Sequence, residues 1–127
     1  MGSRAGKEIF GKTSFICKMK SKVVFAEAKL KEAFDKLKDS KTEEKKLYEW
    51  LNRAFDDIAQ NAFCGTQVPK RLMPKEYTKK YEITNLWKYD LPKAWRLLYS
   101  VGKDEVLVIS IILEWLDHKE YERRFNY

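Results

Sequence analysis

The stretch AWRLLYSVGKDEVLVISIIL, residues 94–113, decides the fold. In residues 94–101 a large apolar side chain recurs at every second position, which is the period of a half-buried strand. Residues 102–104, Gly-Lys-Asp, form a short hairpin loop in which the glycine accepts a positive φ angle. Residues 106–113 are a continuous apolar run rich in β-branched side chains, as in a strand buried on both faces. The stretch therefore predicts an antiparallel hairpin at the centre of a sheet.

Two helices are predicted upstream of this hairpin. Residues 23–25 read as a short strand, and from Ala26 to Leu37 the apolar residues fall at helical spacing. A second amphipathic helix begins near Thr42, runs to Ala62 and is stopped by Gly65. The two helices form a helical hairpin.

The remaining segments complete the predicted architecture. The prolines at positions 69 and 74 bracket a loop, and residues 77–83 are predicted to be extended. Asp117 and Glu120 form a capping-box pattern for a short last helix. The expected fold is α+β: an N-terminal strand and helical hairpin pack on one face of a small, mainly antiparallel four-stranded sheet, with a short C-terminal helix. We expect the opposite face of the sheet to be uncovered.

The size of the chain predicts one domain. Its 127 residues suit a single core, which we place at residues 20–127, with residues 1–19 as an N-terminal arm. No apolar run approaches the roughly 20 residues of a membrane span, and the N-terminus lacks a signal peptide, so we expect a cytoplasmic protein without a membrane partner.

The positive charge is concentrated in one segment. The chain carries a net charge of +7, and residues 65–103 alone hold nine basic and three acidic residues. Six aromatic residues are interleaved with these charges, a combination typical of surfaces that bind single-stranded nucleic acid. The alternative is that core aromatics merely alternate with surface lysines. The predicted RNA-binding residues are Lys70, Arg71, Lys75, Lys79, Lys80, Lys88 and Lys93.

Two other kinds of site are not expected. Gly6–Thr13 matches the Walker A consensus letter for letter, but no strand precedes it, so we interpret it as a chance match. The single histidine and the two cysteines have no metal-ligand spacing, so no metal is expected, and each cysteine is predicted to be a buried thiol. No cofactor is predicted.

Arg96, His118 and Tyr121 are the candidate catalytic residues. His118 and Tyr121 are three residues apart on the predicted last helix, and Arg96 points away from the apolar row of its strand. Such a set suits RNA cleavage without metal: one group takes the 2′-hydroxyl proton, one protonates the leaving 5′-oxygen, and the arginine offsets charge on the phosphorane. The alternative interpretation is a surface His118 and a core Tyr121.

Residues 81–125 resemble the RelE/ParE superfamily of toxins from toxin–antitoxin systems. The resemblance is carried by W-R-L-L-Y at 95–99, the apolar strand at 106–113 and H-K-E-Y at 118–121. It implies a RelE-like mRNA interferase: a ribosome-dependent endoribonuclease that works without metal by 2′-hydroxyl attack. Arg96 matches the strand arginine, and His118 and Tyr121 match acid/base positions near the C-terminus of relatives.

The resemblance also implies partners and alternatives. The expected partners are a cognate antitoxin protein and the ribosome with mRNA in its decoding site. The same superfamily includes non-catalytic members, so a gyrase-type inhibitor and an RNA-binding relative without nuclease activity are the alternative functions.

Overall fold

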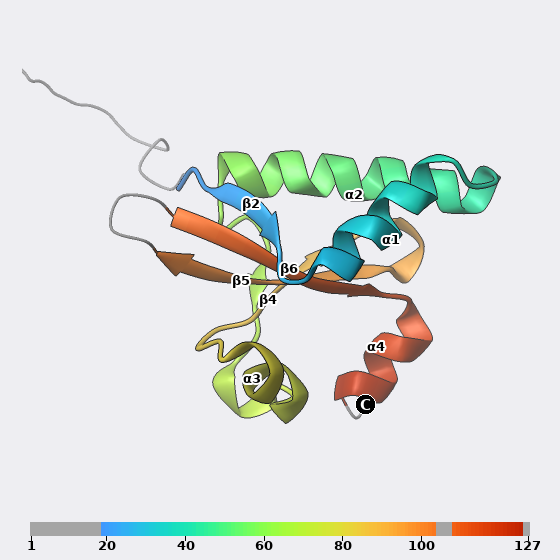
Figure 1. The fold of residues 1–127 in the computed structure, drawn as a ribbon. Helices are drawn as coiled ribbons and strands as arrows, with labels where there is room; N and C mark the ends of the chain where they lie inside the picture. The colour runs from blue at the N-terminus through green and yellow to red at the C-terminus, as the bar shows by residue number, and fades with distance from the viewer. Residues whose placement is uncertain (1–18, 104–107, 126–127) are drawn as a thin grey trace, which may run out of the picture.

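The protein is an α+β fold built on one five-stranded mixed sheet with helices on both faces (Figure 1). The structure, a computed structural model, describes residues 19–103 and 108–125. Residues 1–18 of the arm predicted at residues 1–19, which include the Walker-like motif, lie outside these residues. Along the sheet the strand order is β2-β6-β5-β4-β3.

The central hairpin is confirmed, but the loop predicted at residues 102–104 is wrong at its first two positions, because Gly102 and Lys103 belong to the first strand and Gly102 has no positive φ angle. Strands β5 (Arg96–Lys103) and β6 (Val108–Leu116) pair antiparallel, from Arg96 opposite Leu116 to Lys103 opposite Val108. The register shifts beside Leu98, because Leu98 pairs with Glu114 whereas Tyr99 pairs with Ile112. The intervening Leu113 has no partner of its own, as in a β-bulge.

The prediction of four strands is wrong: the sheet has five strands and is mixed, with three antiparallel pairings and one parallel pairing. β4 (Trp87–Asp90) pairs antiparallel with β5, and the two-residue β3 (Thr66–Gln67) extends the sheet as a fifth strand. β2 (Lys22–Phe25) pairs parallel with β6. A two-residue strand has too few positions to show a period, and the parallel pair joins segments far apart in the sequence, so local patterns report neither.

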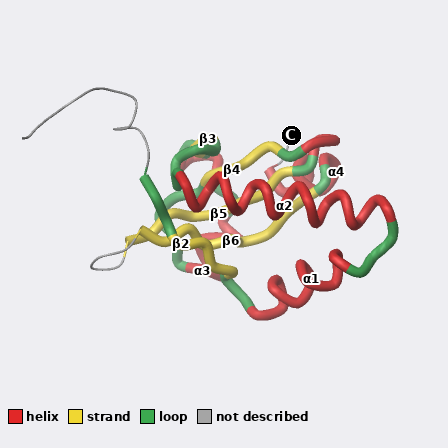
Figure 2. Tube along the Cα trace, turned by 90° about the horizontal axis from the view of Figure 1, so that it is seen from above, coloured by secondary structure: helices red, strands yellow, loops and turns green. Residues whose placement is uncertain are grey.

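The helical hairpin packs on one face of the sheet, as predicted. α1 (Ala28–Lys38) and α2 (Thr42–Gln60) are joined by a short loop, and the strands run beneath α2 (Figure 2). The buried side chains of α2 lie at i, i+4, i+7 and i+11 and, together with one buried side chain of α1, meet the sheet at Leu97, Tyr99 and Ile112. The helix residues of this core are Phe34, Leu47, Leu51, Ala54 and Ile58.

The segment predicted to be extended at residues 77–83 is instead a helix, α3 (Lys75–Tyr81), preceded by a 3₁₀ turn at Lys70–Leu72. Pro74 directly precedes the first helical residue, a position that tolerates a missing N–H. Glu82 ends the helix in the left-handed conformation (φ 52°).

The second face of the sheet is therefore not uncovered as predicted. α3 and α4 (His118–Phe125) both lie on the side opposite α1 and α2 (Figure 1). They share a second core with the sheet, whose buried residues are Val68, Tyr77, Leu86, Leu98, Leu113, Leu116 and Tyr121. Any site on this face is consequently bordered by two helices.

Candidate functional site

α4 begins where the sequence predicts. The Asp117 side chain accepts a hydrogen bond from the backbone N–H of Glu120 (2.9 Å), and the Glu120 carboxylate accepts one from the N–H of Asp117 (3.5 Å). This reciprocal capping box satisfies two donors that a helix start leaves unpaired. The helix starts one residue after β6 ends, which brings its first turns next to the end of the sheet.

Two cations from neighbouring strands meet one ring of α4. The guanidinium carbon of Arg96 on β5 lies 5.3 Å from the centroid of the Tyr121 ring. Nζ of Lys88 on β4 lies 6.0 Å from the same centroid. Both distances are in the range of cation–π contacts. We call Arg96, Lys88, Tyr121 and the neighbouring Asp90 the Arg96 cluster.

Asp90 balances both cations of this cluster. Its Oδ1 lies 3.0 Å from Nε of Arg96 and 3.4 Å from Nζ of Lys88. The contact with Arg96 is outside hydrogen-bond geometry, and this buried Nε has no hydrogen-bond partner among the described residues. Nη1 of Arg96 donates to the backbone oxygen of Trp95 (3.2 Å). These contacts hold Arg96 in place, and its remaining N–H groups can still donate hydrogen bonds to an anion.

The three predicted catalytic residues are only partly brought together. Arg96 and Tyr121 are in contact, but Tyr121 is just 5% exposed and its ring also packs on Phe125, with 4.5 Å between the centroids. The His118 side chain is 58% exposed and its Nε2 lies 3.5 Å from Glu122. A buried Tyr121 and a surface His118 correspond to the alternative interpretation of these two residues.

A second polar network lies on the same face and was not predicted. Tyr77 of α3 donates a hydrogen bond to the carboxylate of Glu114 on β6, and Arg124 of α4 donates to the same carboxylate oxygen. Nη1 of Arg124 also donates to Oη of Tyr77 (3.2 Å), and Nε lies 3.5 Å from Glu76. Burial, followed by the hydrogen bond to Glu114, raises the pKa of the Tyr77 hydroxyl. The network joins α3, α4 and the sheet.

One signal in the sequence pointed to this network. Glu114 follows the apolar residues 111–113 inside a strand, where a carboxylate needs a partner. The pattern does not say which cation supplies it.

Three of the predicted RNA-binding residues border a groove beside the network. Arg71 and Lys75 line a cavity of about 590 Å³ that reaches Arg124 at the end of α4. Lys70 joins Arg71 and Lys75 around an adjoining hollow of about 360 Å³. We call these four residues the basic rim.

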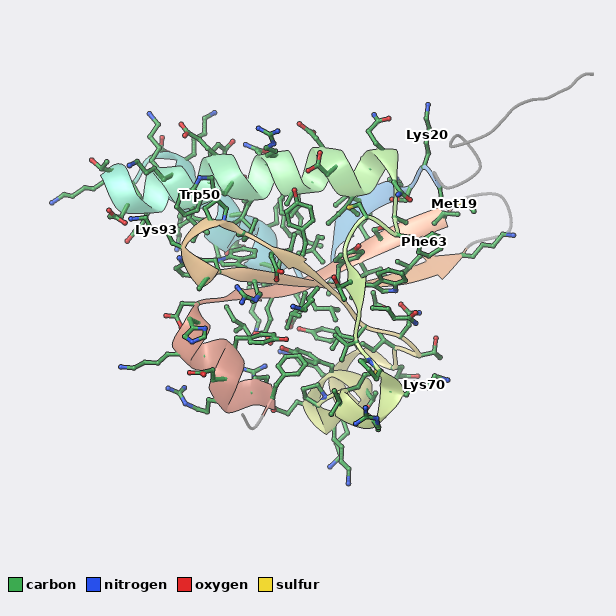
Figure 3. The ribbon with its side chains drawn as sticks, turned by 180° about the vertical axis from the view of Figure 1, so that it is seen from behind. Met19, Lys20, Trp50, Phe63, Lys70 and Lys93 are labelled. Carbon is green, nitrogen blue, oxygen red and sulfur yellow. The ribbon has the colours of Figure 1, made fainter. Side chains whose placement is uncertain are left out.

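The other predicted lysines are dispersed. Lys79 is exposed on α3, and Lys80 pairs with Glu27 (3.2 Å) while its Nζ lies 5.3 Å from the Tyr81 ring centroid. Only Lys88 belongs to the Arg96 cluster. Lys93 lies at a turn near Trp50, well apart from Lys70 (Figure 3). The predicted set is therefore not one surface.

The prediction of buried thiols can be compared with the structure only at Cys64. Cys17 lies outside the described residues, and Cys64 is exposed, so the prediction of a buried thiol there is wrong.

Within residues 19–103 and 108–125, no group of three or more His, Cys, Asp and Glu side chains is placed to hold a metal ion. In the same ranges no helix has the length and apolarity to cross a membrane.

Comparison with known proteins returns no match: no family model, no curated protein and no solved structure matches the chain.

Proposed function

We propose that the protein is a toxin of the RelE type that binds mRNA on the ribosome and cleaves it without metal, and that an antitoxin protein neutralises it in the cytoplasm. The observation that carries the proposal is the Arg96 cluster. It places an arginine and a lysine from two strands on a tyrosine from the last helix, although these residues lie up to 33 positions apart along the chain. The two cations suit an RNA phosphate, and the aromatic ring beside them suits the neighbouring base.

The RNA path runs from the basic rim to the Arg96 cluster. Arg71, Lys75 and Arg124 border the larger groove, and phosphate contacts from such residues position a strand without reading its sequence. Lys88 and Arg96 hold the phosphate that is cut. The polar network of Tyr77, Glu114 and Arg124 joins α3, α4 and the sheet beside the basic rim.

Cleavage is an attack of the RNA on itself. The 2′-oxygen of one ribose bonds to the adjacent phosphorus, the bond to the 5′-oxygen of the next nucleotide breaks, and a 2′,3′-cyclic phosphate and a free 5′-hydroxyl result. Arg96 stabilises the charge on the phosphorane. The roles of Tyr121 and His118 rest on the resemblance alone: it gives them the two proton transfers, one from the 2′-hydroxyl and one to the 5′-oxygen.

An RNA-binding protein without nuclease activity is the second candidate. It is favoured by the burial of Tyr121, which is 5% exposed, and by the position of His118, which pairs with Glu122 at the surface. In this function the Arg96 cluster and the basic rim bind RNA and no bond is broken.

Two measurements test the proposal. The first follows growth after induced expression, and the second uses primer extension to detect new mRNA ends in a translating extract. Arg96→Ala is expected to lower cleavage about 10²-fold, since it removes a transition-state contact. Tyr121→Phe keeps the ring and removes only the hydroxyl. Lys31→Ala is the matched control, because it also removes one positive charge but lies on α1, where Lys31 pairs with Asp35.

The outcomes separate the two candidates. Growth arrest with new mRNA ends, relieved by Arg96→Ala and unchanged by Lys31→Ala, supports the nuclease. RNA binding without new mRNA ends supports the second candidate. Growth arrest that Arg96→Ala and Tyr121→Phe leave unchanged contradicts both assignments of the Arg96 cluster.

A further inference from the structure

Three of the four tryptophans of the chain line one pocket on the helical side of the molecule. The pocket has a volume of about 420 Å³ and is bordered by α1, α2, the turn before β5 and the end of β6. We call it the tryptophan pocket. Its lining residues are Leu37, Glu43, Glu44, Leu47, Trp50, Lys93, Trp95 and Trp115. Neither the Arg96 cluster nor the basic rim contributes to it.

The pocket is assembled from segments that are distant in the sequence. Glu43, Leu47 and Trp50 follow one another at i, i+4 and i+7 along one side of α2. Trp115 on β6 is opposite Leu97, a residue of the core beneath the helices, so its indole faces the same layer. Trp50 and Lys93 lie close to one another on the same side of the molecule (Figure 3).

The turn that places Lys93 and Trp95 in the lining has unusual backbone geometry. Lys93 has φ 59° and Ala94 has φ 64°, although both residues carry a Cβ. Left-handed conformations are unfavourable for such residues and persist where the surrounding structure holds them. Neither position is a glycine, so the left-handed backbone beside the pocket must be held by the surrounding structure.

The lining favours a positively charged guest. The face of an indole ring attracts cations, and tryptophan does so best among the aromatic side chains. Glu43 and Glu44 add two negative charges and Lys93 adds one positive charge, which leaves the lining with a net charge of −1. In the described part of the chain none of these three side chains is held in a salt bridge.

We propose that the tryptophan pocket binds an organic cation, namely an alkylated ammonium group seated against the three indoles with Glu43 and Glu44 at its rim. The group belongs either to a small quaternary ammonium compound or to the side chain of a methylated lysine in a peptide. The site is independent of the RNA chemistry proposed above, because it uses other residues on the other face of the sheet.

A pair of probes of equal shape tests the charge requirement. Choline and its neutral isostere 3,3-dimethylbutan-1-ol are titrated into the full-length protein, and binding is followed by tryptophan fluorescence and by the NMR signals of the indole N–H groups. Choline is expected to bind at least about tenfold more tightly, since the cation–π attraction acts only on the charged compound. Equal, measurable affinities of the two compounds overturn the proposal.

Variants of the exposed rim test the sign of the electrostatic effect without disturbing the core. Glu43→Gln with Glu44→Gln is expected to weaken choline binding several-fold, whereas Lys93→Met is expected to strengthen it. An anion site predicts the opposite sign for both changes, and a purely apolar site predicts no change in either. Either result overturns the proposal. Lys46→Met on exposed α2 is the control for loss of a lysine elsewhere.

A third titration identifies the source of the cation. A short peptide with one trimethyl-lysine is compared with the same peptide carrying unmodified lysine. Tighter binding of the methylated peptide than of choline assigns the pocket to a protein side chain. Tighter binding of choline assigns it to a small molecule. Both results support an alkylated ammonium group, and equal binding of the two peptides together with failure of choline contradicts it.

Discussion

Arg96 and Asp90 are opposite residues on neighbouring strands, and Nε of the arginine lies 3.0 Å from Oδ1 of the aspartate. The same carboxylate oxygen lies 3.4 Å from Nζ of Lys88. One carboxylate thus occupies the position in which a phosphate would meet both cations. An RNA that enters the Arg96 cluster must compete with Asp90, and this competition can be measured.

Asp90→Asn is expected to strengthen the binding of single-stranded RNA. The change leaves Arg96 and Lys88 without their anionic partner, and the gain is about threefold if the exposed pair is worth a few tenths to 1 kcal/mol. Fluorescence anisotropy with a labelled RNA at several salt concentrations measures the effect, which salt should reduce. Asp35→Asn removes the same charge from α1, where Asp35 pairs with Lys31. An equal gain in both variants contradicts a role for the Arg96 cluster.

Tyr77→Phe is expected to lower the free energy of unfolding by about 1–2 kcal/mol, since it deletes the hydroxyl that joins Glu114 and Arg124. Urea denaturation measures the change. Tyr48→Phe is the control: its ring stacks on Phe34 with 4.7 Å between the centroids, and no hydrogen bond to its hydroxyl is found among the described residues. We expect a change within about 0.5 kcal/mol for that variant. Similar losses in the two variants are inconsistent with the network.

Gly65→Ala is expected to destabilise the fold, because a Cβ there would lie 2.5 Å from the backbone oxygen of Lys88 and 2.8 Å from Oη of Tyr99. Backbone cannot yield easily, so we expect a loss of about 1–3 kcal/mol in thermal or urea unfolding. Gly102→Ala is the matched control, since a Cβ at Gly102 meets nothing within 4 Å. If Gly65→Ala is as stable as Gly102→Ala, the close approach between this loop and β4 is absent.

Stability should fall at alkaline pH because of three tyrosines. Burial raises the pKa of Tyr77, Tyr89 and Tyr99 above the ordinary value of 10, and carboxylates that accept hydrogen bonds from Tyr77 and Tyr89 raise it further. The unfolded chain releases these protons near pH 10 and the folded chain does not. The contribution is therefore complete below pH 10 and is lost as the pH rises above it.

NMR of the tyrosine rings during titration measures this effect residue by residue. The signals of Tyr77, Tyr89 and Tyr99 should stay those of neutral phenols until the protein unfolds. Ionisation of these three rings near pH 10 in the folded chain runs against the prediction. Chain unfolded in urea supplies the reference titration.

Local patterns predicted the elements whose causes are local. The alternation at residues 94–101 and the apolar run after it correspond to β5 and β6, and the Asp117–Glu120 pair caps α4 in the predicted way. In α1 and α2 the apolar period also decides which side is buried. In each case the sequence signal, a period or a cap, lies within the element itself or at its first residues.

Elements decided by distant contacts were predicted poorly. Tyr77 and Tyr81 alternate with polar residues as in a strand, yet they also satisfy helical i, i+4 spacing, and burial of Tyr77 beside the sheet favours the helix. The parallel pairing of β2 with β6 has no local sequence signal at all.

In the candidate site, too, local patterns predict single positions, whereas distant contacts decide which residues share a surface. Arg96 and Tyr121 were chosen from strand and helix positions, and the structure places them in contact. The seven basic residues are close in sequence, and this closeness predicts one surface. The left-handed turn at Lys93 and Ala94 instead directs Lys93 to the tryptophan pocket. Which lysines share a face depends on such turns, which composition does not report.

The hydroxyl groups of Ser21 and Ser110 lie 2.9 Å apart, although 89 residues separate them in the chain. They mark the place where the first described strand of the sheet meets the last. Synthesis proceeds from the N-terminus, so β2 leaves the ribosome long before the strand it pairs with exists. The parallel pairing of β2 with β6 can form only after the whole segment between them has been synthesised. An N-terminal fragment that stops before β6 therefore lacks the strand that pairs with both β2 and β5.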